Sequence, residues 1–183
     1  LRAEAEMFEG LPLITLQGSP LYGWNLVIKR VLDVVGASAA LVVFSPVLCA
    51  IAALVKLTSP GPVFFRQLRM GLDGQAFEML KFRAMKLDAE SETGPVWTQP
   101  NDDRRTPIGA FLRRTSLDEL PQFWNVLRGE MSIVGPRPER PEFIARFRET
   151  LPQYMLRHKM KAGITGWAQI NGWRGNTSLE RRI

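Results

Sequence analysis

TSLDELPQFWNVLRGEMSIVGPRP, residues 115–138, joins two adjacent carboxylates to a stiff cationic segment further along the chain. The carboxylates are Asp118 and Glu119, and the segment is GPRP at 135–138. One interpretation is a capping box, with Ser116 as the N-cap and Glu119 three residues later. That helix would meet Pro121 beyond its first turn, so we expect the helix to begin at Asp118 instead. Asp118 then either caps its own helix or offers its carboxylate for phosphate chemistry.

The composition limits the partners and the metal chemistry. The 183 residues include 24 basic and 18 acidic side chains, a net charge of +6, which favours nucleic acid, anionic lipid headgroups or phosphorylated substrates. Cys49 and His158 are the only cysteine and histidine, so a disulfide framework and a cysteine metal cluster are excluded. A bound metal would need oxygen ligands, which suit magnesium or manganese better than zinc. We expect Cys49 to be a small buried hydrophobe and His158 to lie on a solvated face.

Residues 34–55, VVGASAALVVFSPVLCAIAALV, carry no formal charge and as a straight helix would cross a hydrocarbon core about 30 Å thick. Ser45 and Pro46 interrupt this run near its centre, where proline removes a helical hydrogen bond. Basic residues flank both ends, whereas a spanning helix usually has them mainly on one side. Trp24 followed by Lys29 and Arg30 suits a membrane interface. We therefore favour a re-entrant helix-break-helix at 21–60 over a kinked span, with a buried soluble helix pair as the remaining alternative.

The sequence on either side of the central stretch predicts one α+β catalytic domain, predominantly helical, at 61–183. Strands at 63–67 and 76–82 flank GLDG at 71–74 in a small β-hairpin, which ends in the cations Lys81 and Arg83. A short helix after 106–107 ends in Arg113 just before the carboxylates. Amphipathic interfacial helices are expected from residue 139 and over 152–160. Residues 1–20 resemble a linker from a missing upstream region, and 88–104 a surface loop.

Glycines and aromatic residues alternate with amides at 162–173, AGITGWAQINGW. Gln169, Asn171 and Trp173 are the candidates there for recognising a nucleotide or a sugar, because aromatic faces and amide groups suit such ligands.

Taken in order, these motifs resemble the bacterial sugar transferase family, the polyprenyl-phosphate glycosyl-1-phosphate transferases. The resemblance spans residues 25–174 and is strongest to the catalytic part of the larger members that start exopolysaccharide or O-antigen repeat units. Leu1, which is not a methionine, and Ile183, which ends a charged run, look like the ends of a fragment. The larger members carry upstream transmembrane helices and a soluble domain, which would account for Leu1. The family's usual KFRSM has Ala84 in place of the serine here. The motifs are KR at 29–30 with Asp33, SP at 45–46, GPVFF at 61–65 with Gln67 and Arg69, KFR at 81–83, SLDELPQ at 116–122, GPRP at 135–138 and GITGW at 163–167.

The resemblance implies transfer of a sugar 1-phosphate from a UDP-sugar to undecaprenyl phosphate. Asp118 would attack the β-phosphorus, expel UMP and form an aspartyl-phosphosugar that the lipid phosphate then accepts. Glu119 and Asp118 would hold Mg²⁺, or Mn²⁺, which neutralises the phosphates. The cations expected to bind substrate phosphate are Lys81, Arg83, Arg113 and Arg137.

The resemblance also implies a site at the cytoplasmic face of the bacterial inner membrane, beside membrane lipid, and it is compatible with a homodimer. It favours glucose or galactose without deciding between them. A membrane-anchored basic scaffold without catalysis is the alternative, and a glycosyltransferase that releases UDP is a third reading. Nucleic-acid binding is disfavoured, because the basic residues are scattered and the uncharged run has no role in it.

Overall fold

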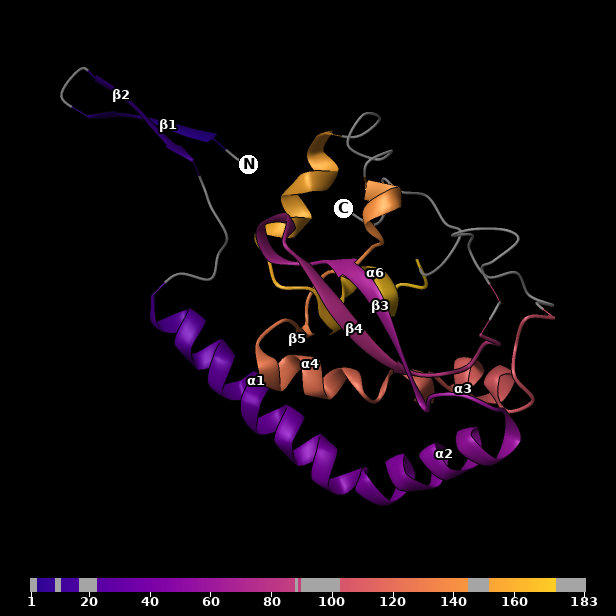
Figure 1. Ribbon diagram of the computed structural model, residues 1–183. Coiled ribbons are helices and arrows are strands. Elements are labelled where there is room, and N and C mark those ends of the chain that lie inside the picture. The colour runs from indigo at the N-terminus through magenta and orange to yellow at the C-terminus, as the bar shows by residue number, and fades with distance from the viewer. Residues whose placement is uncertain are drawn as a thin grey trace.

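The computed structural model describes residues 3–8, 11–16, 23–87, 89, 103–144 and 152–173, and Figure 1 gives their arrangement. The predicted surface loop, apart from residues 89 and 103–104, and residues 145–150 of the first predicted interfacial helix lie outside these ranges. Within the predicted linker, β1 (Ala3–Phe8) and β2 (Leu11–Leu16) form an antiparallel pair.

The uncharged run forms two helices that meet at a bend of 61°, α1 (Trp24–Val43) and α2 (Ser45–Thr58). Phe44 separates them, one residue before the predicted break at Ser45 and Pro46. Pro46 lies in the first turn of α2, where its missing N–H costs no helical hydrogen bond. The Ser45 hydroxyl donates to the carbonyl of Val42 at 2.7 Å. Among the described helices none alone has the length and apolarity to cross a membrane, and only this bent pair satisfies both together.

One face of α1 is built into the protein core, where Asp33 and Ala37 are buried. Arg30 donates to the carbonyls of Val126 and Leu127 at 2.6 and 2.7 Å. Lys29 donates to Asp33 at 2.6 Å, so both cations bind protein groups. The two cations thus fix α1 to the domain, and the membrane interface suggested for them stays a prediction.

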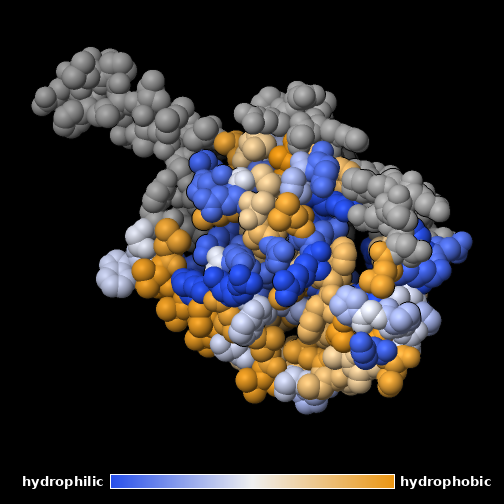
Figure 2. Space-filling view, viewed as in Figure 1, coloured by the Kyte–Doolittle hydropathy of each residue, from blue (hydrophilic) through white to orange (hydrophobic). Residues whose placement is uncertain are grey.

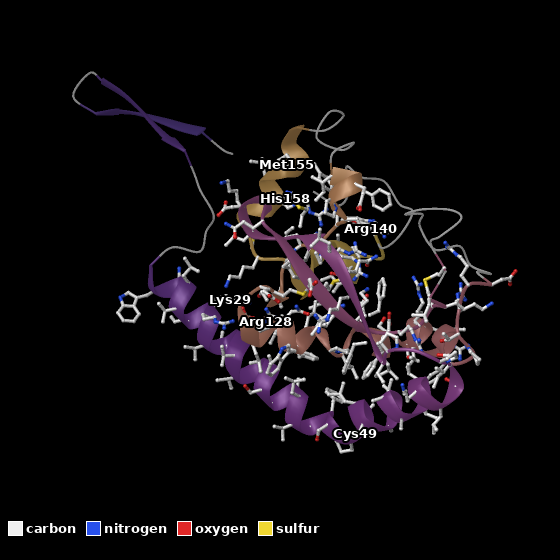
Figure 3. All side chains as sticks on the ribbon, in the orientation of Figure 1. Lys29, Cys49, Arg128, Arg140, Met155 and His158 are labelled. Carbon is white, nitrogen blue, oxygen red and sulfur yellow. The ribbon has the colours of Figure 1, made fainter. Side chains whose placement is uncertain are left out.

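The opposite side of the helix pair is apolar and exposed. Figure 2 shows this as the hydrophobic lower margin of the molecule, where α1 and α2 lie in Figure 1. Cys49 belongs to the exposed side and points away from the domain in Figure 3, so the prediction that it is buried in the protein is wrong. The large exposed side chains on this pair include Leu32, Val35, Val42, Val43, Leu54 and Leu57.

The predicted hairpin is confirmed as β3 (Phe64–Met70) and β4 (Ala76–Phe82), with the 3-10 helix η1 (Leu72–Gly74) between them. The turn needs a positive φ at Asp73 and at Gly74, 51° and 75°. Met79 in β4 is buried with Ala37, Val126 and Met131 in one core cluster. Since side chains alternate along a strand, Lys81 lies on the same face as Met79 and is directed to the domain interior.

The rest of the described domain follows the hairpin in the chain. Its elements are α3 (Gly109–Thr115), η2 (Leu117–Glu119), α4 (Gln122–Arg128), β5 (Ser132–Val134), η3 (Pro152–Lys159), β6 (Gly163–Thr165) and α6 (Trp167–Ile170). Of these, η2 and α4 contact β4. Residues 141–144 are also helical, and β5 pairs with β6 in parallel. Helices with three two-stranded sheets in the described ranges confirm the α+β class.

Candidate active site

The two carboxylates lie in a tight turn between α3 and α4. Ser116 has a left-handed backbone, φ 59°, which ends α3 and directs the chain into η2, where Asp118 and Glu119 are each 6% exposed. Helix α4 begins at Gln122 with Pro121 as its N-cap, so the predicted helix start at Asp118 is wrong. The Ser116 side chain makes no capping hydrogen bond, so the capping box is absent as well.

Glu119 is held by two cations from distant parts of the chain. Its Oε1 lies 2.9 Å from Nζ of Lys81 and 2.7 Å from Nη2 of Arg137. Nη1 of Arg137 lies 3.3 Å from Oε2, which makes this a two-donor grip on the carboxylate. The structure therefore brings together three predicted site residues from β4, η2 and the GPRP segment.

Burial and charge act in opposite directions on this cluster. Burial would raise the pKa of Glu119, but the charges of Lys81 and Arg137 hold it far below its usual range. Burial lowers the pKa of Lys81 to about 8, although Glu119 opposes the shift. The pKa of Arg137 is raised, because Glu119 outweighs the opposite effect of burial. Near neutral pH the three groups form one charged cluster with a net positive charge beside Asp118.

The GPRP segment is fixed to its surroundings residue by residue. The N–H of Gly135 donates to Thr165 O at 2.9 Å, and the carbonyl of Pro136 accepts from the N–H of Gly163 at 2.9 Å. Arg157 Nη2 donates to the carbonyl of Arg137 at 2.6 Å, and Arg69 Nη1 donates to the carbonyl of Pro138 at 3.1 Å. The two prolines have no N–H to satisfy. This network holds the backbone of Arg137 in one position facing Glu119.

Close glycine contacts join the GPRP segment to the GITGW motif. A Cβ on Gly163 would come within 2.1 Å of the backbone N of Gly135. A Cβ on Gly166 would come within 2.2 Å of the carbonyl oxygen of Gly135. Both motifs therefore need glycine so that two backbones can cross at contact distance.

Arg69 is a further cation that interacts electrostatically with this cluster, and the sequence did not single it out for the site. In the hairpin register Arg69 of β3 pairs with Phe77 of β4. Its Nε donates to Oε1 of Gln67, two residues earlier, at 3.1 Å. Burial lowers its pKa to about 10, with Glu139 opposing and Arg137 adding to the shift. The hairpin register could have found it, since Gln67 and Arg69 share the face that carries Lys81.

Arg83 and Arg113 have other contacts. Arg83 is 3% exposed and donates from Nη2 to the carbonyl and hydroxyl of Ser59 at 2.8 and 2.6 Å, which ties β4 to the end of α2. Arg83 is thus engaged by the chain that follows α2, and its role in binding phosphate stays a prediction. Arg113 lies in α3, the helix that precedes the turn. Its Nη1 is 3.1 Å from the sulfur of Met85.

The two amides proposed for recognition lie in and after α6. Gln169 Nε2 donates to the carbonyl of Ile164 at 3.0 Å, inside the strand that carries Gly163. Asn171 is exposed, and its Nδ2 donates to the carbonyl of Trp167 at 2.9 Å. Trp173 is half-buried. The described contacts attach Gln169 to the β5–β6 pair that leads into GPRP, and they keep Asn171 at the end of its own helix.

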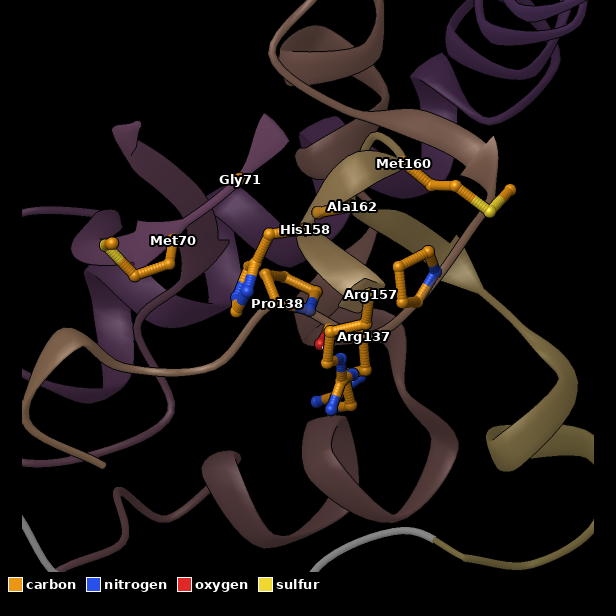
Figure 4. A pocket seen from close by; sticks show the side chains of 9 residues that line it. Met70, Gly71, Arg137, Pro138, Arg157, His158, Met160 and Ala162 are labelled. Carbon is orange, nitrogen blue, oxygen red and sulfur yellow. The ribbon is translucent and has the colours of Figure 1, made fainter. Parts of the chain in front are cut away.

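His158 is buried, at 7% exposed, so its predicted solvated position is wrong. It lies on η3 with Tyr154. The guanidinium carbon of Arg157 lies over the Tyr154 ring, 4.6 Å from its centre. A small pocket beside GPRP is lined by Arg137, Arg157 and His158, as Figure 4 shows. The helix predicted at 152–160 is a 3-10 helix in the structure, and two of its side chains are buried in the protein.

The two carboxylates of the turn suit magnesium if a substrate supplies further oxygen ligands. The described residues hold no group of three or more His, Cys, Asp or Glu side chains that could bind a metal. Asp118 and Glu119 offer two carboxylates, and Glu119 is already shared with Lys81 and Arg137. Magnesium commonly binds through one or two carboxylates together with substrate phosphates. These residues therefore fit a magnesium ion that arrives with a diphosphate.

The chain is 52% identical over 187 residues to a UDP-glucose:undecaprenyl-phosphate glucose-1-phosphate transferase of Escherichia coli K12, covering all of this chain and 40% of that protein. A Klebsiella pneumoniae protein of the same name is 49% identical, with the same coverage. A UDP-N-acetylgalactosamine-undecaprenyl-phosphate N-acetylgalactosaminephosphotransferase of Aeromonas hydrophila is 45% identical over 156 residues, 85% of this chain and 36% of that one.

The chain thus spans about 40% of the length of the first two relatives. Residues 24–183 match the family described as bacterial sugar transferase, a range that includes the helix pair, the hairpin and the carboxylate turn. The resemblance seen in the motifs is confirmed, and the chain belongs to the bacterial sugar transferase family.

Proposed function

We propose that this chain transfers a sugar 1-phosphate from a UDP-sugar to undecaprenyl phosphate and releases UMP. The named relatives are transferases that act on undecaprenyl phosphate, two of them with UDP-glucose and one with UDP-N-acetylgalactosamine. The observation that carries the proposal is the two-cation grip on Glu119 beside the buried Asp118. Buried positive charge of this kind is what an anionic nucleophile needs when it approaches a diphosphate.

In the proposed reaction the carboxylate of Asp118 attacks the β-phosphorus of the UDP-sugar. The bond from that phosphorus to the oxygen of UMP breaks, and the phosphosugar stays on Asp118 as an acyl phosphate. An oxygen of the lipid phosphate then attacks the same phosphorus, and the Asp118 carboxylate is released unchanged. The product is a polyprenyl diphosphate sugar, and neither step consumes or releases a proton on Asp118.

Lys81 and Arg137 supply fixed positive charge where the phosphates accumulate negative charge. Because the backbone of Arg137 is held by Arg157 and by the strand pair, its guanidinium needs little rearrangement when substrate binds. Asp118 and Glu119 would hold magnesium together with the substrate phosphates. The metal would neutralise the diphosphate and the departing UMP.

The lipid substrate makes a membrane position part of the proposal. The exposed apolar side of α1 and α2 would enter the bilayer, and the bend at Phe44 supports a re-entrant pair. The carboxylate turn would then lie at the headgroup plane, where a lipid phosphate and a soluble nucleotide sugar can both reach it. We propose the cytoplasmic face of the inner membrane, since UDP-sugars are cytoplasmic substrates.

The test is release of UMP from a panel of UDP-sugars, with magnesium and undecaprenyl phosphate in nanodiscs. Wild-type chain is compared with Asp118→Asn, which keeps the shape and removes the nucleophile. We expect lipid-dependent UMP from one donor and at least a thousandfold loss in the variant, on the order of losses seen for nucleophiles. Release of UDP would mean that the sugar moves without its phosphate. Equal activity in Asp118→Asn would favour the scaffold alternative.

A further inference from the structure

Gln122 is a buried polar residue that the mechanism above does not use. It opens α4, and only 2% of it is exposed. Its Nε2 makes no hydrogen bond with any atom in the described part of the chain. Buried amide donors normally have a partner, and a donor left without one opposes folding. An unpartnered donor at this position therefore suggests a hydrogen-bond acceptor from outside the chain.

The backbone places Gln122 in a row with two residues whose contacts are known. The N–H groups of Glu119 and Leu120 bond to carbonyls three residues back at 3.1 and 3.3 Å, and those of Phe123 and Trp124 do the same at 3.2 and 3.0 Å. In such turns, side chains three residues apart lie one above the other. Glu119, Gln122 and Asn125 consequently form one row that faces β4.

The two neighbours in the row both bind groups of β4. Glu119 at one end binds Lys81. Asn125 at the other end accepts from the N–H of Leu80 at 3.0 Å and donates to the carbonyl of Glu78 at 2.7 Å. Gln122 lies between them, beside the same stretch of strand. Its amide is thus next to the charged cluster, yet its donor has no partner among the described residues.

We propose that Nε2 of Gln122 donates a hydrogen bond to a phosphoryl oxygen of the bound substrate, on the diphosphate first and on the Asp118 phosphosugar afterwards. The inference rests on the proposed function and adds a substrate contact to it. Lys81 and Arg137 attract the phosphates by charge, whereas a neutral amide gives a directional bond to one oxygen. Hydrogen bonds to anionic oxygens are stronger than those between neutral groups, and a donor already in place needs no reorganisation.

The experiment compares Gln122→Met, Gln122→Glu and the control Asn125→Leu in the full chain in detergent. Gln122→Met keeps the length and removes the donor, and Gln122→Glu replaces it with a negative group. We expect Gln122→Met to keep or raise the melting temperature while kcat/KM for UMP release falls about 10- to 100-fold. Gln122→Glu should lose more activity, because its carboxylate repels phosphate. Asn125→Leu should lower the melting temperature, since its amide has partners in the free protein.

Two results would overturn the inference. One is a folded Gln122→Met chain with kcat/KM within about twofold of the wild type, because loss of a bond to an anion costs more than that. The other is a drop in melting temperature as large as that of Asn125→Leu, because the amide would then be satisfied without substrate.

Failure of the proposed function has a different signature. Wild type would release no UMP from any donor, and inorganic pyrophosphate with magnesium would then be the probe. A smaller pyrophosphate-dependent rise in melting temperature for Gln122→Met than for wild type would still support the phosphate contact, and an equal rise would reject it.

Discussion

Lys81 is a member of the cluster whose charge changes near pH 8. Burial lowers its pKa to about 8, and Glu119 only partly opposes this. Glu119 itself stays ionised, because Lys81 and Arg137 hold its pKa far below the usual range against the effect of burial. As the pH rises through about 8, the cluster therefore loses the lysine charge and keeps the carboxylate.

We expect UMP release to fall above about pH 8, roughly tenfold for each further pH unit. Lys81→Arg should move this fall to higher pH, because a guanidinium keeps its proton. Unfolding is not the cause: in the unfolded chain Lys81 keeps its proton up to about pH 10.5, so the unfolded state binds more protons in this range. The free energy of unfolding contributed by Lys81 therefore rises with pH. An unchanged pH profile in Lys81→Arg would contradict the assignment.

At the scale of elements, Asp33 attaches α1 to β5. Its Oδ1 accepts from Lys29 Nζ at 2.6 Å, from the hydroxyl of Ser132 at 3.1 Å and from the N–H of Ile133 at 3.0 Å. Since β5 runs directly into GPRP, this carboxylate links the helix pair to the segment that carries Arg137.

Asp33→Ala should destabilise the fold by about 2–4 kcal/mol, because three donors lose a buried acceptor. Chemical denaturation in detergent measures the change. The matched control is Glu78→Ala, which removes an exposed ion pair to Arg66 at 3.4 Å and should cost less than about 1 kcal/mol. Equal effects of the two substitutions would mean that Asp33 does not anchor α1.

The crossing of GPRP and GITGW is a contact between backbones. We expect Gly163→Ala to separate the two segments and to reduce activity at least tenfold, on the order of the cost of a small misplacement of catalytic groups. The control is Gly36→Ala in α1, whose Cβ would meet only the end of the Ile133 side chain at 2.7 Å and whose alanine favours the helix. UMP release and melting temperature distinguish them, and equal activity losses would argue against a special role for this crossing.

These elements also explain which features the sequence could predict. Local patterns determine the hairpin and the bent helix pair. Motif resemblance assigned Lys81, Glu119 and Arg137 to one site, and the three side chains are in contact in the structure. The contacts of Arg83 and Arg30 could not be predicted, because their acceptors are distant in the sequence. Arg83 binds the Ser59 carbonyl and Arg30 binds the end of α4. Arg69 was missed because its place beside the cluster follows from strand register, and the role proposed for Gln122 rests on a helical row.

For the molecule as a whole, the bend between α1 and α2 limits how deeply the pair can enter a bilayer. The helices have 20 and 14 residues and are about 30 and about 21 Å long. With a bend of 61°, the bend lies about 13 Å from the line joining their outer ends. That is less than half of a hydrocarbon core about 30 Å thick. If both outer ends lie at one membrane surface, as in the proposed re-entrant insertion, the pair therefore stays within one leaflet.

Single cysteines test this topology, because Cys49 is the only cysteine in the chain. Trp24→Cys and Leu57→Cys, each with Cys49→Ser, put a thiol at exposed positions near the outer ends of the pair. A membrane-impermeant maleimide added to sealed vesicles of known orientation should label both from the same side, and Cys49 of the wild type from neither, because the bilayer covers it. Labelling of the two ends from opposite sides would mean that the pair spans the membrane. Labelling of Cys49 in intact vesicles would mean that the apolar face lies outside the bilayer, and the lipid phosphate would then have to leave the headgroup plane to reach Asp118.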